Sequence, residues 1–192
     1  MKNPEGPEVK VLLVDDEADL ANMVATFLEK ECNRINATAA TGVVEGLEEL
    51  TTGTFDCIVS DYDMPKQTGI EFLRTVREDN PEIPFILYTG KGSEEVASDA
   101  ISAGATDYLQ KGRGTDQYRI LANRIENAFE QKQSKEKHQR KVDAIESAQE
   151  GIALFDSDGN HVSVNKAYAD IHNSTEEELV ETHWSELYTD GG

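Results

Sequence analysis

Residues 11–16 read Val-Leu-Leu-Val-Asp-Asp, a fully apolar run that ends in two adjacent carboxylates. A short apolar run rich in branched residues favours a strand that is buried on both faces. Three later apolar runs have the same form: residues 57–59 ahead of Asp61, residues 85–88 ahead of Thr89, and residues 108–109 ahead of Lys111. If the four runs are parallel strands, their polar groups emerge at one edge of one sheet. The sequence therefore predicts a cleft that holds three carboxylates, a hydroxyl and a lysine.

Helical patterns separate these runs, because apolar positions recur after each run with the period of a helix. Ser93 is typical of a residue that caps the start of such a helix. Residues 34–39 form a weaker strand candidate, which is acceptable only at the edge of a sheet. Residues 9–129 thus contain five βα units. They predict an α/β domain of the flavodoxin-like type, with a doubly wound, five-stranded parallel sheet covered by helices on both faces.

The remainder of the chain differs in character from residues 9–129. Residues 130–150 are charged and lack Pro and Gly, so we expect them to extend the last helix as a connector. A coiled coil and a plain solvated helix both remain open for this connector, since its heptad pattern is apolar only at its ends. Residues 151–192 predict a β-hairpin around Gly159, followed by helical segments. So short an α+β segment cannot easily close a core, and we interpret it as the front of a domain cut short.

The composition is strongly acidic, with 38 Asp and Glu against 18 Lys and Arg and a formal net charge of −20. Such a surface repels phosphates and argues against binding to nucleic acid. An ordinary solvated acidic protein remains open, but we favour adaptation to molar salt, which screens this self-repulsion. Cys32 and Cys57 are too few for a disulfide framework, and no apolar stretch is long enough to span a membrane. We therefore expect a reduced, cytoplasmic protein.

The predicted cleft requires a cation, because carboxylates repel one another. Two unit charges about 4 Å apart interact by roughly 4 kcal/mol at an effective dielectric constant of about 20. Gathering Asp15, Asp16 and Asp61 therefore favours a bound Mg²⁺ or Mn²⁺, which prefer oxygen ligands. Lys111 adds a compact positive charge, and Thr89 adds a hydroxyl donor. An ionised Asp61 is a competent nucleophile for in-line attack on a phosphoryl group.

These segments together resemble the response-regulator receiver domain of two-component signalling. The likeness is carried by residues 11–17, 60–65, 88–90 and 107–111, and by the intervals between the four polar positions. The resemblance implies that Asp61 accepts a phosphoryl group from a phosphohistidine, so the partner would be a sensor histidine kinase or a phosphotransfer protein. It also implies that Asp16, Asp61 and the backbone carbonyl of Asp63 bind Mg²⁺, with Asp15 acting mainly through water.

The resemblance further implies a conformational switch made by Thr89 and Tyr108. A phosphoryl group adds a charge of about −1.5 to −2, which would draw the threonine inward and bury the tyrosine. Gly112 stands where the family usually has proline, so we expect a more mobile loop after the lysine. Asp63 and Lys91 either pair across the cleft and tune the lifetime of the acyl phosphate, or are ordinary solvated charges.

Two further resemblances bear on function. The sequence around Asp61 and Asp63 is also similar to the nucleophile loop of haloacid-dehalogenase-type phosphatases, but the acidic pair here precedes the nucleophile, which favours a regulatory phosphoacceptor over an enzyme. Residues 152–156, 165–168 and 176–179, with Gly159 and Trp184, resemble the start of a PAS sensor domain. The chain would then be part of a larger haloarchaeal hybrid or PAS-containing histidine kinase. The alternative is a stand-alone receiver that works by docking to a partner kinase. Separately, a homodimer formed through the receiver face or the connector helix remains open.

Overall fold

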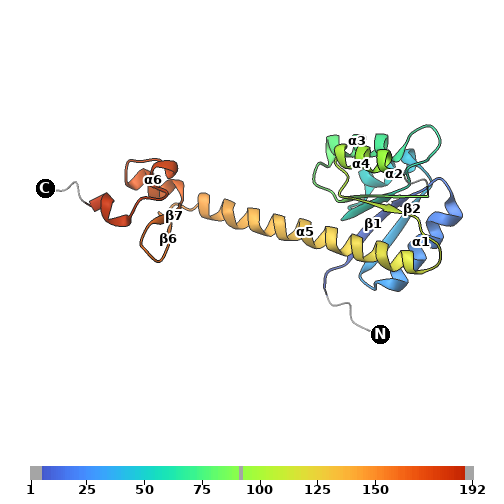
Figure 1. Ribbon diagram of the computed structural model, residues 1–192, viewed down its shortest axis with the longest axis horizontal. Helices are drawn as coiled ribbons and strands as arrows, with labels where there is room; N and C mark the ends of the chain where they lie inside the picture. Colours follow the sequence, from blue (N-terminus) through green and yellow to red (C-terminus); the bar gives the residue numbers. More distant parts are fainter. Residues whose placement is uncertain (1–5, 91–92, 189–192) are drawn as a thin grey trace. The chain divides into compact units, whose positions relative to one another are not determined.

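A computed structural model of the chain describes residues 6–90 and 93–188. Within these residues a parallel sheet is formed by β1 (Val9–Val14), β2 (Ile35–Ala40), β3 (Cys57–Ser60), β4 (Phe85–Thr89) and β5 (Asp107–Gln110). The strand order is β2-β1-β3-β4-β5, and Figure 1 labels the neighbouring strands β1 and β2. The predicted flavodoxin-like sheet is confirmed, including the weak candidate strand, which forms β2 at one edge.

Helices cover both faces of this sheet. Helices α1 (Ala18–Glu31) and α5 (Asp116–Glu146) pack on one face, and α2 (Val43–Thr52), α3 (Gly69–Asp79) and α4 (Glu94–Ser102) pack on the other (Figure 1). The side chains of β1 alternate between the two cores: Val11 and Leu13 face α1 and α5, whereas Leu12 and Val14 face the other three helices. This two-sided burial explains why the strand sequences are continuously apolar.

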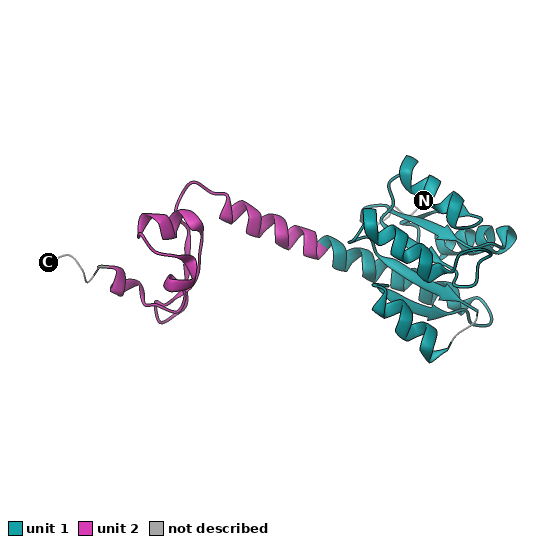
Figure 2. Cartoon of the chain, turned by 90° about the horizontal axis from the view of Figure 1, so that it is seen from above, with its two compact units in different colours: residues 1–133 teal, residues 134–192 magenta. Residues whose placement is uncertain are grey.

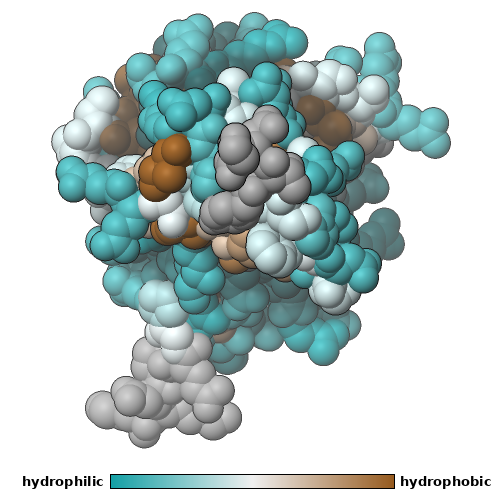
Figure 3. Space-filling model, turned by 90° about the vertical axis from the view of Figure 1, so that its left-hand side faces the viewer, coloured by the Kyte–Doolittle hydropathy of each residue, from teal (hydrophilic) through white to brown (hydrophobic). Residues whose placement is uncertain are grey.

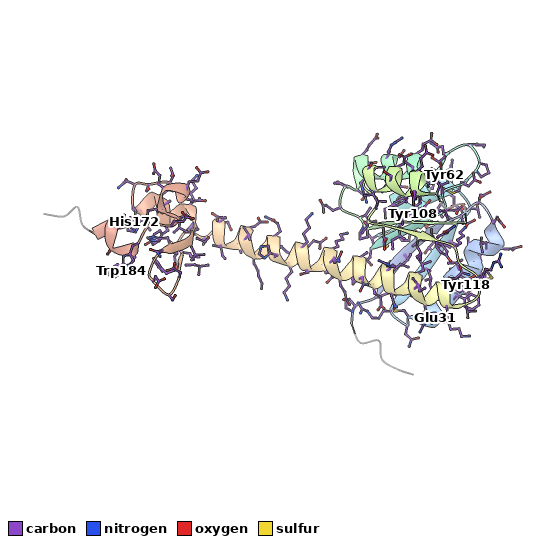
Figure 4. The ribbon with its side chains drawn as sticks, viewed as in Figure 1. Glu31, Tyr62, Tyr108, Tyr118, His172 and Trp184 are labelled. Atoms are coloured by element: carbon purple, nitrogen blue, oxygen red, sulfur yellow. The ribbon has the colours of Figure 1, made fainter. Side chains whose placement is uncertain are left out.

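Local signals place the helix ends. The Ser93 side chain accepts a hydrogen bond from the backbone of Val96, as predicted for the cap of α4. Thr68 and Glu71 form a reciprocal capping box at the start of α3, the helix that follows Asp61. On the opposite face, Tyr118 of α5, which is labelled in Figure 4, stacks on Phe27 of α1 with ring centroids 4.6 Å apart. These contacts fix the helices that surround the carboxyl edge of the sheet.

The chain divides into two compact units, residues 1–133 and residues 134–192 (Figure 2). Helix α5 continues across the division, which confirms the predicted extension of the last helix, and ends at Glu146 rather than at residue 150. The second unit contains the predicted hairpin of β6 (Ala153–Phe155) and β7 (His161–Val164), then α6 (Lys166–Ile171), α7 (Glu176–Leu179) and the 3₁₀ helix η1 (Trp184–Tyr188). The buried core of its hydrophobic cluster is small: Val164, Ala169 and Leu179.

The surface is mainly polar. The face shown in Figure 3 is largely hydrophilic and is interrupted by separate hydrophobic side chains. In the described part of the second unit the large exposed apolar side chains are Val142, Ile145, Leu154, Phe155, Val162, Ile171, Val180 and Trp184. Across the described part of the chain, no helix combines the length and the apolar character needed to cross a bilayer.

Candidate functional site

The carboxyl ends of the central strands bring the predicted polar residues together. The backbone hydrogen bonds between neighbouring strands continue beyond the strand ends, because the backbone N–H of Asp61 donates to the carbonyl of Val14 at 2.8 Å. In the same way the N–H of Lys111 donates to the carbonyl of Thr89 at 2.7 Å. Parallel pairing of β1 with β3 and of β4 with β5 therefore holds these positions at one edge. The predicted placement at one edge is confirmed for these residues.

Lys111 forms the centre of the site. Its Nζ lies 2.7 Å from Oδ2 of Asp15 and 3.0 Å from Oδ1 of Asp61. Burial acts to lower the pKa of Lys111, but the hydrogen bond to Asp15 and the charge of Asp61 outweigh burial, so this pKa is raised above its ordinary value. The ammonium therefore stays charged at neutral pH and compensates two carboxylates that would otherwise repel each other.

Asp61 is buried and has one acceptor atom available. Its side chain Oδ2 accepts a hydrogen bond from the backbone N–H of Asp63 at 3.1 Å. Among the described residues, Oδ1 finds no hydrogen bond of acceptable geometry, although Lys111 Nζ lies within ion-pair distance. A buried oxygen of this kind costs free energy unless a ligand or solvent completes its bonding. The geometry thus leaves the lone pairs of Oδ1 available for chemistry.

The first helical residue of α3 presses on the backbone of Asp61. A Cβ added at Gly69 would overlap the carbonyl oxygen of Asp61 and would lie 2.8 Å from Cδ1 of Leu87. The Ser60 hydroxyl donates to the same carbonyl at 2.8 Å. The main chain at Asp61 is therefore held between β3 and α3, which leaves little freedom for its position.

The acidic pair does not act as a unit. Asp15 is buried, and its Oδ1 accepts a hydrogen bond from the backbone of Glu17 at 3.0 Å. Asp16 is exposed and lines an open pocket beside α2 and residues 64–67. Adjacent residues at a strand end point to opposite sides, so only one of the pair can face Lys111. The structure gathers two of the three predicted carboxylates around the lysine and leaves the third exposed.

The carboxylates at this edge are too few to enclose a metal ion by themselves. Over residues 6–90 and 93–188, no group of three or more His, Cys, Asp or Glu side chains is arranged to hold a metal ion. Magnesium, however, commonly takes only one or two carboxylates and completes its shell with water and phosphate oxygens. The Asp61 carboxylate, whose Oδ1 has no hydrogen bond of acceptable geometry among the described residues, is a group of that type. The residues present therefore fit Mg²⁺ bound with several waters better than they fit an all-protein cage.

The remaining predicted residues lie on β4 and β5. Thr89 is fully buried at the end of β4. Tyr108 of β5 is half-buried against the core formed with α2, α3 and α4 (Figure 4). Its hydroxyl is buried, and within the described ranges it has no hydrogen-bond partner. Asp63 is exposed, and Lys91 lies outside the described residues.

One residue at this edge was not predicted from the sequence. Gln117, in the first turn of α5, accepts a 2.5 Å hydrogen bond from the Tyr88 hydroxyl and a 3.0 Å bond from the backbone N–H of Gly112. Its amide group also donates to the carbonyl of Gly114 at 2.8 Å. A glutamine in the first turn of a helix is ordinarily solvated, so no sequence signal marks this role. The loop expected to be mobile has two backbone groups anchored by this side chain.

Similarity to known proteins covers the first unit. Residues 11–122 match the family model described as response regulator receiver domain. The chemotaxis protein CheY of Pseudomonas aeruginosa is 30% identical over 124 residues, which cover 64% of this chain and 97% of CheY. The phosphoglycerate transport system transcriptional regulatory protein PgtA of Salmonella typhimurium is 32% identical over 127 residues, which cover 66% of this chain but only 29% of PgtA. A solved receiver domain protein from Clostridium thermocellum shares 29% identity at a TM-score of 0.58, covering 65% of this chain and 97% of its own.

Proposed function

The chain belongs to the response regulator receiver family, and on that premise we propose that Asp61 accepts a phosphoryl group from a phosphohistidine of a sensor histidine kinase or phosphotransfer protein. One observation carries the proposal: the buried Asp61 has an uncommitted Oδ1 beside a charged lysine at 3.0 Å. A lone pair aimed into a positively charged site is what nucleophilic attack on a phosphoryl group requires. The domain acts as a regulatory phosphoacceptor rather than as a turnover enzyme.

In the proposed transfer, Oδ1 of Asp61 attacks phosphorus. The new O–P bond forms as the P–N bond to the donor imidazole breaks, and the imidazole leaves with the bonding pair. Negative charge spreads over the equatorial phosphoryl oxygens, and Lys111 Nζ lies beside the attacking atom to stabilise it. Oδ2 remains hydrogen-bonded to the N–H of Asp63, which fixes the orientation of the carboxylate.

The site would hold Mg²⁺, with Mn²⁺ as a substitute, through Asp16, Asp61 and the backbone carbonyl of Asp63. Asp15 would contribute mainly through water, because its Oδ2 is engaged by Lys111. When bound, the ion would neutralise charge on the carboxylates and on the phosphoryl oxygens. Asp16 is supported as a ligand by its exposure directly after the buried Asp15, where water remains accessible.

We extend the proposal to the switch. Thr89 would donate its hydroxyl to a phosphoryl oxygen, and Tyr108 would report this movement on the α4–β5 side of the domain. Asp63 and Lys91 would tune the lifetime of the acyl phosphate. Alanine at both positions with an unchanged dephosphorylation half-life excludes that role.

Two proposals concern the wider protein. We propose that residues 9–129 form the receiver, that residues 130–150 connect it onward, and that residues 151–192 begin a PAS sensor domain of a hybrid or PAS-containing histidine kinase. The β6–β7 hairpin and the two short helices that follow support the last assignment. We also propose adaptation to molar salt of the haloarchaeal kind, supported by the net charge of −20. Thermal unfolding that is unaffected between about 0.1 M and 2 M KCl contradicts it.

The central proposal is tested with acetyl phosphate and Mg²⁺ at high salt, followed by intact mass measurement. Wild type should gain one phosphoryl group, and Asp61→Asn should gain none. Asp99→Asn, an exposed change on α4, is the matched control and should be modified like wild type. An unmodified wild type, or an adduct that persists in Asp61→Asn, overturns the assignment.

A further inference from the structure

Gln117 contacts the immediate neighbours of two residues of the phosphoacceptor site. It accepts from the backbone N–H of Gly112, which follows Lys111, and from the hydroxyl of Tyr88, which precedes Thr89. A single side-chain oxygen thus joins the two strand ends that carry the lysine and the threonine. We propose that Gln117 is a positioning residue, which holds Lys111 over the acceptor carboxylate and transmits a displacement of Lys111 to helix α5.

The contact with Tyr88 bears directly on Lys111. The tyrosine ring is buried at 2% exposure, and Lys111 Nζ lies 5.7 Å from its centroid. A cation over an aromatic ring is attracted to the ring face, so the ring helps to set the path of the lysine side chain. Gln117 orients the hydroxyl end of that ring. It therefore restrains Lys111 in two ways, through the Tyr88 ring beside the lysine side chain and through the backbone of Gly112, the next residue.

The loop itself offers little alternative anchorage. Gly112 and Gly114 have no side chains, and Gly114 adopts a left-handed conformation with φ of +83°. The carbonyl of Gly114 accepts the hydrogen bond from Nε2 of Gln117 at 2.8 Å. Both ends of the amide are therefore used, and the loop is fastened to α5 at two points. Ordering glycine costs more conformational entropy than ordering other residues, and these hydrogen bonds offset part of that cost.

The other side of the contact is a well-packed helix. Tyr118, the next residue, is buried and stacks on Phe27 of α1 with an interplanar angle of 9°. Leu121, Ile125 and Phe129 continue the buried stripe of α5. A helix held this firmly responds as a unit to a pull at its first turn. This inference rests on the proposed function, because Lys111 moves only if Asp61 is phosphorylated.

The first experiment needs no phosphorylation. Amide hydrogen exchange of residues 112–114 is compared between wild type, Gln117→Met and Gln117→Glu. Methionine keeps the volume but removes every polar contact, so the Gly112 amide should exchange about tenfold faster, as expected for one lost hydrogen bond. Glutamate keeps the acceptor for Gly112 and Tyr88 and should keep most of the protection. Gln133→Met, an exposed change on the same helix, is the control and should leave the exchange unaltered.

The second experiment follows phosphorylation. With acetyl phosphate, Gln117→Met should reduce the saturating rate severalfold at an unchanged KM, because Lys111 acts on the transition-state charge. Phosphorylation should change exchange in the first turn of α5 in wild type but not in Gln117→Met. The inference is overturned if amide hydrogen exchange at residues 112–114 is equal in wild type and Gln117→Met. It is also overturned if α5 responds to phosphorylation in the same way in these two proteins. A wild type that takes no phosphoryl group refutes the proposed function instead, and the first experiment still decides whether Gln117 holds the loop.

Discussion

Tyr108 carries a hydroxyl that is buried without a hydrogen-bond partner among the described residues. A buried unpaired polar group costs about 1–3 kcal/mol, so this side chain is held inward by its ring packing rather than by its hydroxyl. We therefore expect Tyr108→Phe to leave stability unchanged or to raise it by about 1 kcal/mol. Tyr108→Ala should instead lose stability, because it removes the buried ring. Urea unfolding measures both changes, and a Phe variant clearly less stable than wild type would reveal a hydrogen bond to the hydroxyl.

Lys111 should make stability depend on pH only in the alkaline range. Replacement by Met leaves Asp15 and Asp61 without their shared cation and should cost roughly 2 kcal/mol at neutral pH without Mg²⁺, below the value for a fully buried pair. The folded pKa of Lys111 is raised, so its contribution is complete below the unfolded value of about 10.4 and is lost as pH rises through the folded pKa.

The measurement is the difference in unfolding free energy between wild type and Lys111→Met across pH. It should stay constant from about pH 7 to pH 10 and shrink above the unfolded pKa. Lys137→Met, an exposed change on α5, controls for the general titration of lysines and should show no such trend. A difference that already disappears near neutral pH is incompatible with this ion pair.

At the level of elements, the start of helix α3 packs directly against the backbone of Asp61. Gly69→Ala should be strongly destabilising, because its Cβ would overlap the Asp61 carbonyl and crowd Leu87. Backbone shifts of this kind typically cost about 1–3 kcal/mol. The matched change is Gly112→Ala, whose Cβ would meet only Cβ of Gln117 at 3.6 Å, an ordinary contact. Thermal unfolding of the two variants should therefore differ clearly, and equal stabilities would show that α3 can shift away from Asp61.

The elements that could be predicted from sequence are those whose signal is local. Continuous apolar runs specified β1, β3 and β4, because both faces of these strands are buried. The edge strand β2 was only a weak candidate, since its residues are partly exposed and its identity depends on pairing with β1. For the site, the ends of the predicted strands indicated which polar residues lie at the carboxyl edge of the sheet, and nothing finer.

What the sequence could not supply was side-chain direction and long-range contact. The sequence does not distinguish the two adjacent aspartates. In the structure Asp15 faces Lys111 and Asp16 faces solvent, because successive side chains of a strand point to opposite faces. Gln117 contacts Tyr88 across a sequence separation of 29 residues, and no pattern marks such a pair. The predicted helix after residue 129 was correct, but its end at Glu146 lacks a glycine or proline signal.

At the scale of the whole molecule, the two units have unequal cores. The first unit buries two extensive clusters on the two faces of its sheet. The second buries three hydrophobic residues in its cluster and leaves several apolar side chains exposed. Because burial of apolar area supplies most of the folding free energy, the second unit should be the less stable one.

Trp184 provides a direct test, since it is the only tryptophan of the chain and lies in η1 of the second unit (Figure 4). It is 49% exposed, so unfolding should still change its fluorescence moderately. In urea, the fluorescence midpoint should fall below the midpoint of the far-ultraviolet circular dichroism, which reports mainly the helices and strands of the first unit. Trp184→Phe should leave the dichroism transition in place. Coincident midpoints would mean that the two units unfold cooperatively, and the small core of the second unit would then have to draw its stability from the first.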